Sequence, residues 1–149
     1  MVVTRETIAT QSAPAPGGHY SQAVAYGDLV FISGQLPNVS AGADGASADF
    51  ESQARRALAN LLAVLDAAGC STDEVLKVTA YIVGIEHWPA FNRAYADVMG
   101  SARPARSVVP VPALHHGYLI EIDAVAGRAA KESSSCHDDE RRSERVRVP

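Results

Sequence analysis

A long amphipathic helix followed by a half-buried strand constrains the fold of this chain more than any other pattern in it. Residues 49–68 carry apolar side chains at helical spacing, with Asp49 suited to the start of the helix and Gly69 to its end. Residues 75–83 alternate between two faces instead. One face is predicted to carry Leu76, Val78, Ala80 and Ile82, and the other Lys77, Thr79 and Tyr81. We therefore expect the helix to pack on a sheet that contains this strand.

The remaining elements complete a mixed sheet. Strands are predicted over residues 4–10, 23–26, 29–33, 107–111 and 118–126, and a second helix over residues 89–99 with a buried stripe of Phe91, Ala94, Tyr95 and Val98. This order predicts an α/β (α+β) single domain, in which a mixed β-sheet carries two helices packed on one face. The other face would stay open and apolar in a monomer, so we expect a homo-oligomer.

One arginine and one glutamate interrupt the last two apolar strands, which we expect to pair with each other. Arg106 stands at the start of the first strand and Glu121 inside the second. A lone charge in such a strand is costly unless something pairs with it. A guanidinium fits a carboxylate through two parallel hydrogen bonds, and a glutamate can exchange a proton or orient a water. The two residues therefore predict a site that binds a carboxylate substrate and performs acid–base chemistry, with a structural Arg–Glu ion pair as the alternative.

Composition limits the size, partners and location of the protein. We place one folded domain at residues 1–130 and a disordered polar tail at residues 131–149, because the tail has five acidic, five basic and few apolar residues. The net charge is −4, and Lys77 is the only lysine before the tail, which argues against nucleic acid as a partner. We also expect no membrane partner and a cytoplasmic location, because no apolar run is long enough to span a bilayer and no signal-peptide pattern is present.

The cysteine and histidine spacings do not predict a metal site. Cys70 and Cys136 form no CxxC or Cys/His ligand pattern, and two unlinked cysteines fit a reducing compartment. His115 and His116 are adjacent, and neighbours on a strand point to opposite faces, so they would not chelate one metal together. We expect no metal and interpret the two histidines as part of a polar turn.

Seven groups of residues occur in one order along residues 10–126. They are Ala13–Ala15 with Tyr20–Gln22, Phe31–Gln35, Gln53–Gly69, Val75–Thr79, Phe91–Tyr95, Pro104–Ser107 and Ile120–Ile122. Together they make the chain similar to the Rid (YjgF-type) reactive intermediate deaminase family, whose members act on enamines and imines. Each group alone is a weak signal, whereas seven in register form a specific one.

This resemblance implies both an architecture and an activity. The implied architecture is a chorismate-mutase-like fold that assembles as a homotrimer with inter-subunit sites. The implied reaction is hydrolytic deamination of enamine or imine intermediates such as 2-aminoacrylate to 2-keto acids and ammonia, as in a 2-iminobutanoate/2-iminopropanoate deaminase, with no cofactor. Arg106 matches the arginine that binds the substrate carboxylate, and Glu121 matches the acid that positions a water.

Four further residues are candidates for contact with the small-molecule substrate. Tyr20, Ser33 and Asn92 match residues that line the cleft in the family. Gly34 follows Ser33, and its missing side chain would let a ligand approach the backbone. Each has a structural alternative: capping of a loop for Tyr20, a tight strand end for Ser33 and Gly34, and helix structure for Asn92.

The chain also departs from the family pattern. The common Gly-Pro-Tyr-Ser is Gly-His-Tyr-Ser at residues 18–21 of this chain. The common Val-Glu-Val-Ala-Arg-Leu-Pro is Val-Pro-Val-Pro-Ala-Leu-His at residues 109–115. Pro110 and Pro112 remove two strand donors, which predicts an irregular or edge strand. These departures bear on substrate identity more than on fold. A non-enzymatic trimer that binds keto acids through Arg106 is the alternative function.

Overall fold

The computed structural model of the protein describes residues 3–39 and 45–128, so the predicted tail at 131–149 and the domain boundary at residue 130 lie outside the described residues. The strands are β1 (Arg5–Ile8), β2 (Ala23–Tyr26), β3 (Leu29–Gln35), β4 (Val75–Val83), β5 (Ala105–Val111) and β6 (Ile120–Gly127). The helices are α1 (Phe50–Ala67) and α2 (Trp88–Met99), and the short 3-10 turns are η1 (Gly45–Ser47), η2 (Thr72–Glu74), η3 (Ile85–His87) and η4 (His115–Gly117).

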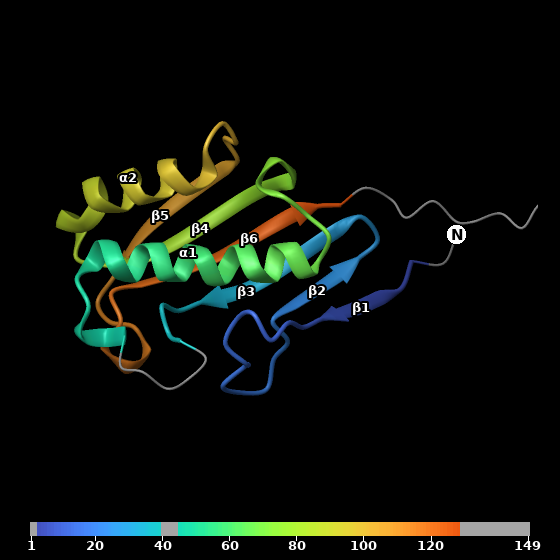
Figure 1. Ribbon diagram of the computed structural model, residues 1–149, viewed down its shortest axis with the longest axis horizontal. Helices are drawn as coiled ribbons and strands as arrows, with labels where there is room; N and C mark the ends of the chain where they lie inside the picture. Colours follow the sequence, from blue (N-terminus) through green and yellow to red (C-terminus); the bar gives the residue numbers. More distant parts are fainter. Residues whose placement is uncertain (1–2, 40–44, 129–149) are drawn as a thin grey trace, which may run out of the picture.

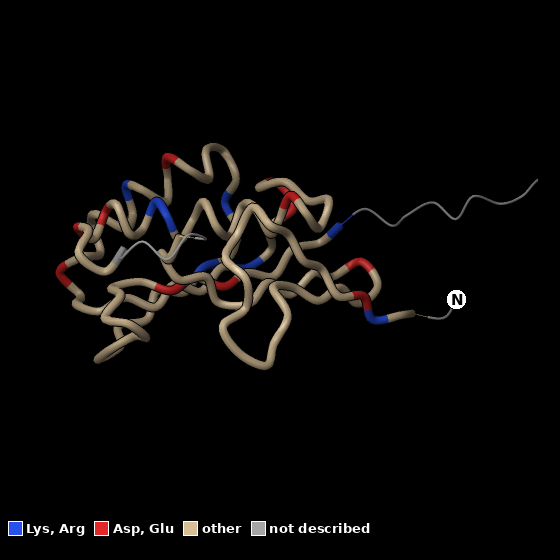
Figure 2. Tube along the Cα trace, turned by 60° about the horizontal axis from the view of Figure 1, so that its bottom comes forward, with Lys and Arg blue, Asp and Glu red and all other residues tan. Residues whose placement is uncertain are grey.

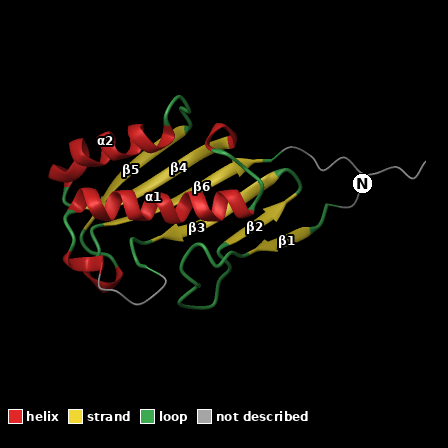
Figure 3. Ribbon diagram, in the orientation of Figure 1, coloured by secondary structure: helices red, strands yellow, loops and turns green. Residues whose placement is uncertain are grey.

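The six described strands form one mixed sheet in the order β1-β2-β3-β6-β4-β5. Neighbours pair antiparallel except β4 and β5, which are parallel and connected through α2. Both helices lie on the same face of the sheet (Figures 1 and 3). The predicted α+β class with two helices on one face is therefore confirmed, as is the predicted edge position of the proline-containing strand, which is β5.

Helix α1 begins and ends where local chemistry favours it. Asp49 is the N-cap, and its Oδ1 accepts a hydrogen bond from the Ser52 backbone N–H at 2.9 Å. Gly69, just beyond the C-cap, has a φ of +75°, a conformation that glycine adopts without steric cost. On the surface, Arg55 bridges Glu51 of α1 and Asp97 of α2 at 2.8 Å each. Figure 2 shows acidic and basic residues interspersed along the described trace.

Two predicted faces differ in detail from the structure. Leu76 is 51% exposed, because the pairing of β4 with β6 shifts register between Val75 and Lys77. This bulge removes Leu76 from the face that carries Val78, although strict alternation placed it there. In α2, Met99 is buried whereas Val98 is only partly buried. The rest of the predicted α2 stripe is buried as expected.

The core lies between the helices and one face of the sheet. Its largest fully buried side chains include Leu58, Leu61 and Leu65 of α1, Phe91 of α2, and Ile82, Ile120 and Ile122 of the sheet. The opposite face, which we call the open face, carries exposed Tyr26, Leu29, Phe31 and Val109. No helix within the described residues is both long and apolar enough to cross a bilayer.

Candidate active site

The first half of the candidate site lies at the end of β3, beside β6. The register between these strands shifts by one residue there, which forms a bulge. Ser33 Oγ donates to the Ser21 carbonyl oxygen at 2.6 Å, and the Ser33 backbone N–H donates to the Gln22 carbonyl oxygen at 3.0 Å. These bonds join the end of β3 to the loop that carries Tyr20.

The Glu121 side chain, on β6, lies against Gly34 of this bulge. A Cβ atom on residue 34 would overlap the Glu121 carboxyl group where it now lies, so any larger residue would force that side chain to move away. The start of β6 is itself fixed by the buried Gln53 of α1, whose Oε1 accepts from the Leu119 backbone N–H at 2.9 Å. The glycine and the glutamine together hold the acid at a defined place on the sheet.

The environment of Glu121 changes its acidity. Burial raises the pKa of the Glu121 carboxyl group, because a charged form is less stable away from water. His115 acts in the opposite direction and lowers the pKa, whereas the neighbouring Asp123 carboxylate raises it. A carboxyl group with a raised pKa holds its proton closer to neutral pH, which suits it to general acid–base chemistry.

A hollow of about 390 Å³ surrounds this carboxyl group. Its lining residues come from the loop before β2, the end of β3, the η4 turn and β6: Tyr20, Ser33, Gly34, Leu36, His115 and Glu121. The Tyr20 hydroxyl accepts a hydrogen bond from the Gly17 backbone N–H at 3.2 Å, which holds the exposed ring at this position. We call this space the Glu121 hollow.

The second half of the candidate site joins β5 to α2. Arg106 Nη1 and Nη2 each donate to Asn92 Oδ1 at 3.2 Å. The guanidinium carbon lies 4.8 Å from the Tyr95 ring centroid and 5.4 Å from that of Phe91, within the range of cation–π attraction. A hollow of about 370 Å³ adjoins these residues. The ion pairs include none to Arg106, so the guanidinium is oriented without a carboxylate partner among residues 3–39 and 45–128.

The two halves lie on opposite faces of the sheet within one chain. Arg106 pairs in register with Val78 of β4, which is buried under the helices, whereas Glu121 pairs with Tyr81 three residues further along β4. The prediction that the Arg106 and Glu121 strands pair with each other is wrong, because β4 lies between β5 and β6. A structural Arg106–Glu121 ion pair within the chain is excluded by the same arrangement.

Comparison with known proteins identifies the family. The sequence profile described as endoribonuclease L-PSP matches residues 10–128 of the chain. This chain belongs to that family. A RutC family protein of Pyrococcus horikoshii is 40% identical over 122 residues, which are 82% of this chain and 97% of that protein. The structure of YyfA from Yersinia pestis, described as a member of the conserved Rid protein family, has a TM-score of 0.79 and 38% identity, and the match covers 83% of this chain and 99% of that one. The resemblance to the Rid (YjgF-type) family is therefore confirmed.

Two further members of the family carry more specific descriptions. The goat protein named 2-iminobutanoate/2-iminopropanoate deaminase is 37% identical over 83% of this chain and 90% of its own length. The structure of Escherichia coli TdcF with bound serine has a TM-score of 0.78 and 35% identity, and the match covers 83% of this chain and 99% of that one. Members of the family thus include a named deaminase and a protein that binds an amino acid.

The structure groups the sequence-predicted residues of this Rid family protein into two sets. Tyr20, Ser33, Gly34 and Glu121 line the Glu121 hollow, and Asn92 with Arg106 line the other. The sequence did not assign His115 to the Glu121 hollow, although its departure from the family pattern was a signal. Helical spacing predicts that Phe91 and Tyr95 are buried, but it does not reveal that their rings lie against the Arg106 guanidinium.

Proposed function

We propose that this Rid family protein hydrolyses 2-imino acids and their enamine tautomers, such as 2-aminoacrylate, to 2-keto acids and ammonia. One observation carries the proposal. The chain combines an oriented guanidinium that has no carboxylate partner among the described residues with a partly buried carboxyl group of raised pKa beside a glycine. The first suits a substrate carboxylate, and the second suits proton transfer to a water or an amine. The name of the goat relative supports the same reaction.

The reaction needs positioning and one acid–base group. Protonation of the enamine at its terminal carbon, with loss of a proton from nitrogen, gives the imine. Arg106 holds the carboxylate, and Glu121 takes a proton from the water that adds to the C=N carbon. Glu121 gives this proton to the imine nitrogen, which forms the carbinolamine. It then takes the proton of the carbinolamine hydroxyl group and gives it to the amino group, so that the C–N bond breaks, ammonia leaves and the hydroxyl oxygen becomes the keto oxygen. Binding contributes by holding the water and the imine carbon in contact.

We also propose that the complete site forms between two copies of the chain in a homotrimer. The arrangement of Arg106 and Glu121 on opposite faces of one sheet supports a shared site, because neither side chain can reach the other's hollow within a chain. The apolar residues of the open face support an assembly that covers them. The number three comes from the family. Light scattering that found a stable monomer at micromolar concentration would contradict this proposal.

A coupled assay tests the activity. A pyridoxal-phosphate dehydratase supplies 2-aminoacrylate from serine, and ammonia release is timed with and without this protein. The proposed deaminase accelerates release beyond the uncatalysed rate. A protein that binds the keto-acid product but gives no acceleration would instead be the non-enzymatic trimer.

Mixing two inactive variants tests the shared site. Arg106→Lys and Glu121→Gln are each expected to form poorly active trimers. Trimers assembled from equal amounts of both variants place a native arginine opposite a native glutamate in about a quarter of the sites, if each site uses one residue from each of two neighbours. Recovery of about a quarter of the native rate is therefore expected. A site contained within one chain would give no recovery, because every chain carries one defect.

A further inference from the structure

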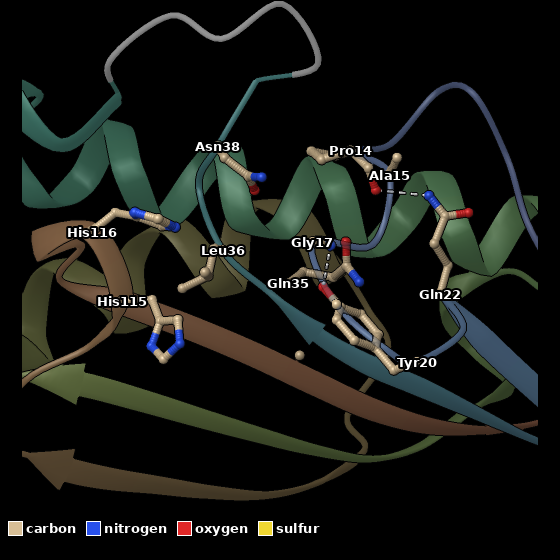
Figure 4. Close-up of a pocket in the computed structure, with 12 residues that line it drawn as sticks. Pro14, Ala15, Gly17, Tyr20, Gln22, Gln35, Leu36, Asn38, His115 and His116 are labelled. Atoms are coloured by element: carbon tan, nitrogen blue, oxygen red, sulfur yellow. Dashed lines mark hydrogen bonds between the residues drawn. The ribbon is translucent and has the colours of Figure 1, made fainter.

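A second hollow adjoins the Glu121 hollow and shares a wall with it. Its volume is about 270 Å³, and it lies among the residues drawn in Figure 4. Tyr20, Gly34, Leu36 and His115 line both hollows. A small molecule held at Glu121 therefore has an adjoining space into which a side chain can extend.

The lining of this second hollow has a distinct chemistry. None of its described lining residues is Lys, Arg, Asp or Glu. Apolar contacts come from residues such as Pro14, Ala15 and Leu36. The hydrogen-bonding side chains are one tyrosine, three amides and two imidazoles: Tyr20, Gln22, Gln35, Asn38, His115 and His116. Such a lining suits a ligand group that is polar but carries no full charge. A charged ligand group would lose its contacts with water on entering and would meet no Lys, Arg, Asp or Glu side chain of opposite charge in the lining.

Gln22 shapes the wall of the hollow but is already committed to the backbone. Its Nε2 donates to the carbonyl oxygens of Thr10 at 3.1 Å and Pro14 at 2.9 Å, and its Oε1 accepts from the Thr10 backbone N–H. The Tyr20 hydroxyl differs, because it accepts from Gly17 and keeps its own proton to donate. Tyr20 is therefore the better candidate for a ligand contact.

The η4 turn brings two imidazoles to the same hollow. His116 has a φ of 58°, in the left-handed region, and the following Gly117 has a φ of 71°. Adjacent residues of a strand would point to opposite faces, but this turn lets both His115 and His116 line one space. Figure 4 shows the two imidazoles at one end of the drawn residues and the Tyr20 ring at the other.

We propose that this second hollow receives the substrate side chain and selects 2-imino acids whose side chain ends in an uncharged hydrogen-bonding group such as a carboxamide. The inference rests on the proposed deaminase function. Imidazole and hydroxyl groups supply the donors and acceptors that a carboxamide needs. An apolar side chain of the same shape would leave them unpaired, which is how polar sites discriminate against isosteres. A side chain that ends in a carboxylate is disfavoured in the second hollow, because the Glu121 carboxyl group lines the adjoining hollow and like charges repel.

Three imines test the proposed selection. An amino-acid oxidase generates them from alanine, leucine and asparagine, and semicarbazide competes with the protein for each imine as it forms. Leucine and asparagine have side chains of nearly equal shape, so the pair isolates hydrogen bonding from size. We expect kcat/KM for the asparagine-derived imine to exceed that for the leucine-derived imine by about tenfold, the upper range for one hydrogen bond. Calorimetric affinities for the two corresponding keto acids should differ in the same direction.

The His116→Gly variant tests whether the second hollow causes the preference for the asparagine-derived imine. His116 lines that hollow and is absent from the lining of the Glu121 hollow. Glycine keeps the left-handed backbone, and we expect the asparagine-to-leucine ratio to fall about fivefold. His19→Gly is the matched control: His19 is exposed and lines neither hollow, so the ratio should not change.

The outcomes separate this inference from the proposed function. Acceleration of the alanine-derived imine, without preference for the asparagine-derived over the leucine-derived one, would overturn the side-chain subsite and leave the deaminase proposal standing. A preference that persists in His116→Gly would assign selection to other residues and also overturn the subsite. No acceleration of any of the three imines would overturn both proposals.

Discussion

Arg106 and Glu121 are held by different means on the two faces of one sheet. The Arg106 half is built from neighbouring segments, α2 and the start of β5, and one amide oxygen and two aromatic rings orient its guanidinium. The Glu121 half draws on four segments between residues 20 and 121, and burial raises the pKa of its carboxyl group, which lies against Gly34.

The difference follows from the chemistry of the two groups. A guanidinium stays charged at any ordinary pH, so it needs orientation more than tuning, and a half-exposed edge strand suffices. A carboxyl group becomes an effective acid or base near neutral pH only when its surroundings shift its pKa. Substitutions in the two halves should therefore have different effects on turnover, substrate binding and pH dependence.

Glu121→Gln should lower kcat for imine hydrolysis by about 10²-fold, the lower range for one general acid–base group. Glutamine keeps the shape and the hydrogen-bonding capacity but cannot exchange a proton. Keto-acid binding, measured by calorimetry, should persist because Arg106 lies in the other half. Unchanged turnover in a folded variant would remove Glu121 from the mechanism.

Arg106→Lys should lower kcat/KM by at least about tenfold, because lysine keeps the charge and loses the planar fork of donors. Steady-state kinetics with the coupled assay measures the loss, and light scattering measures assembly. The oligomer should survive, because Arg106 is assigned to substrate. Dissociation into monomers would instead assign Arg106 to the subunit interface.

Substitutions of Tyr95 separate its ring from its hydroxyl. Tyr95→Leu should raise KM about threefold, because the guanidinium loses an aromatic contact worth somewhat less than 1 kcal/mol at a half-exposed site. Tyr95→Phe keeps the ring and removes a buried hydroxyl that has no hydrogen-bond partner within the described structure. Thermal unfolding should show this variant to be more stable by about 1 kcal/mol, the cost of a buried unsatisfied group. Equal KM values for the leucine and phenylalanine variants would show that the ring does not position Arg106.

The smallest effect concerns pH and stability. A raised pKa means that Glu121 binds its proton more tightly in the folded chain than in the unfolded chain. The free energy of unfolding therefore falls as pH rises from the pKa of Glu121 in the unfolded chain through its pKa in the folded chain. Glu121→Gln removes that titration. Calorimetry should therefore show the Tm of the variant, relative to the native protein, to be higher at about pH 7 than at about pH 4. A variant less stable at the higher pH would mean that the charged carboxylate has a stabilising partner.

The sequence determined the elements and the candidate residues, because these depend on local patterns. Helical spacing and end signals located α1 to within a residue at each end, and alternation located β4 at its observed bounds. The charges inside two apolar strands indicated Arg106 and Glu121, the motifs indicated Tyr20, and the missing side chain indicated Gly34. Where the local pattern was interrupted, as at the bulge that exposes Leu76, alternation alone gave the wrong face.

Tertiary structure alone decided how these residues meet. Strand order is set by which edges pair in space, so the sequence could not show that β4 separates β5 from β6 and places Arg106 and Glu121 on opposite faces. Likewise, the packing of Glu121 against Gly34 joins residues that are far apart in the chain, and the left-handed η4 turn directs both histidines to one hollow. Sequence periodicity reports which face of its own element a side chain occupies, whereas contacts between distant segments depend on how those elements pack together.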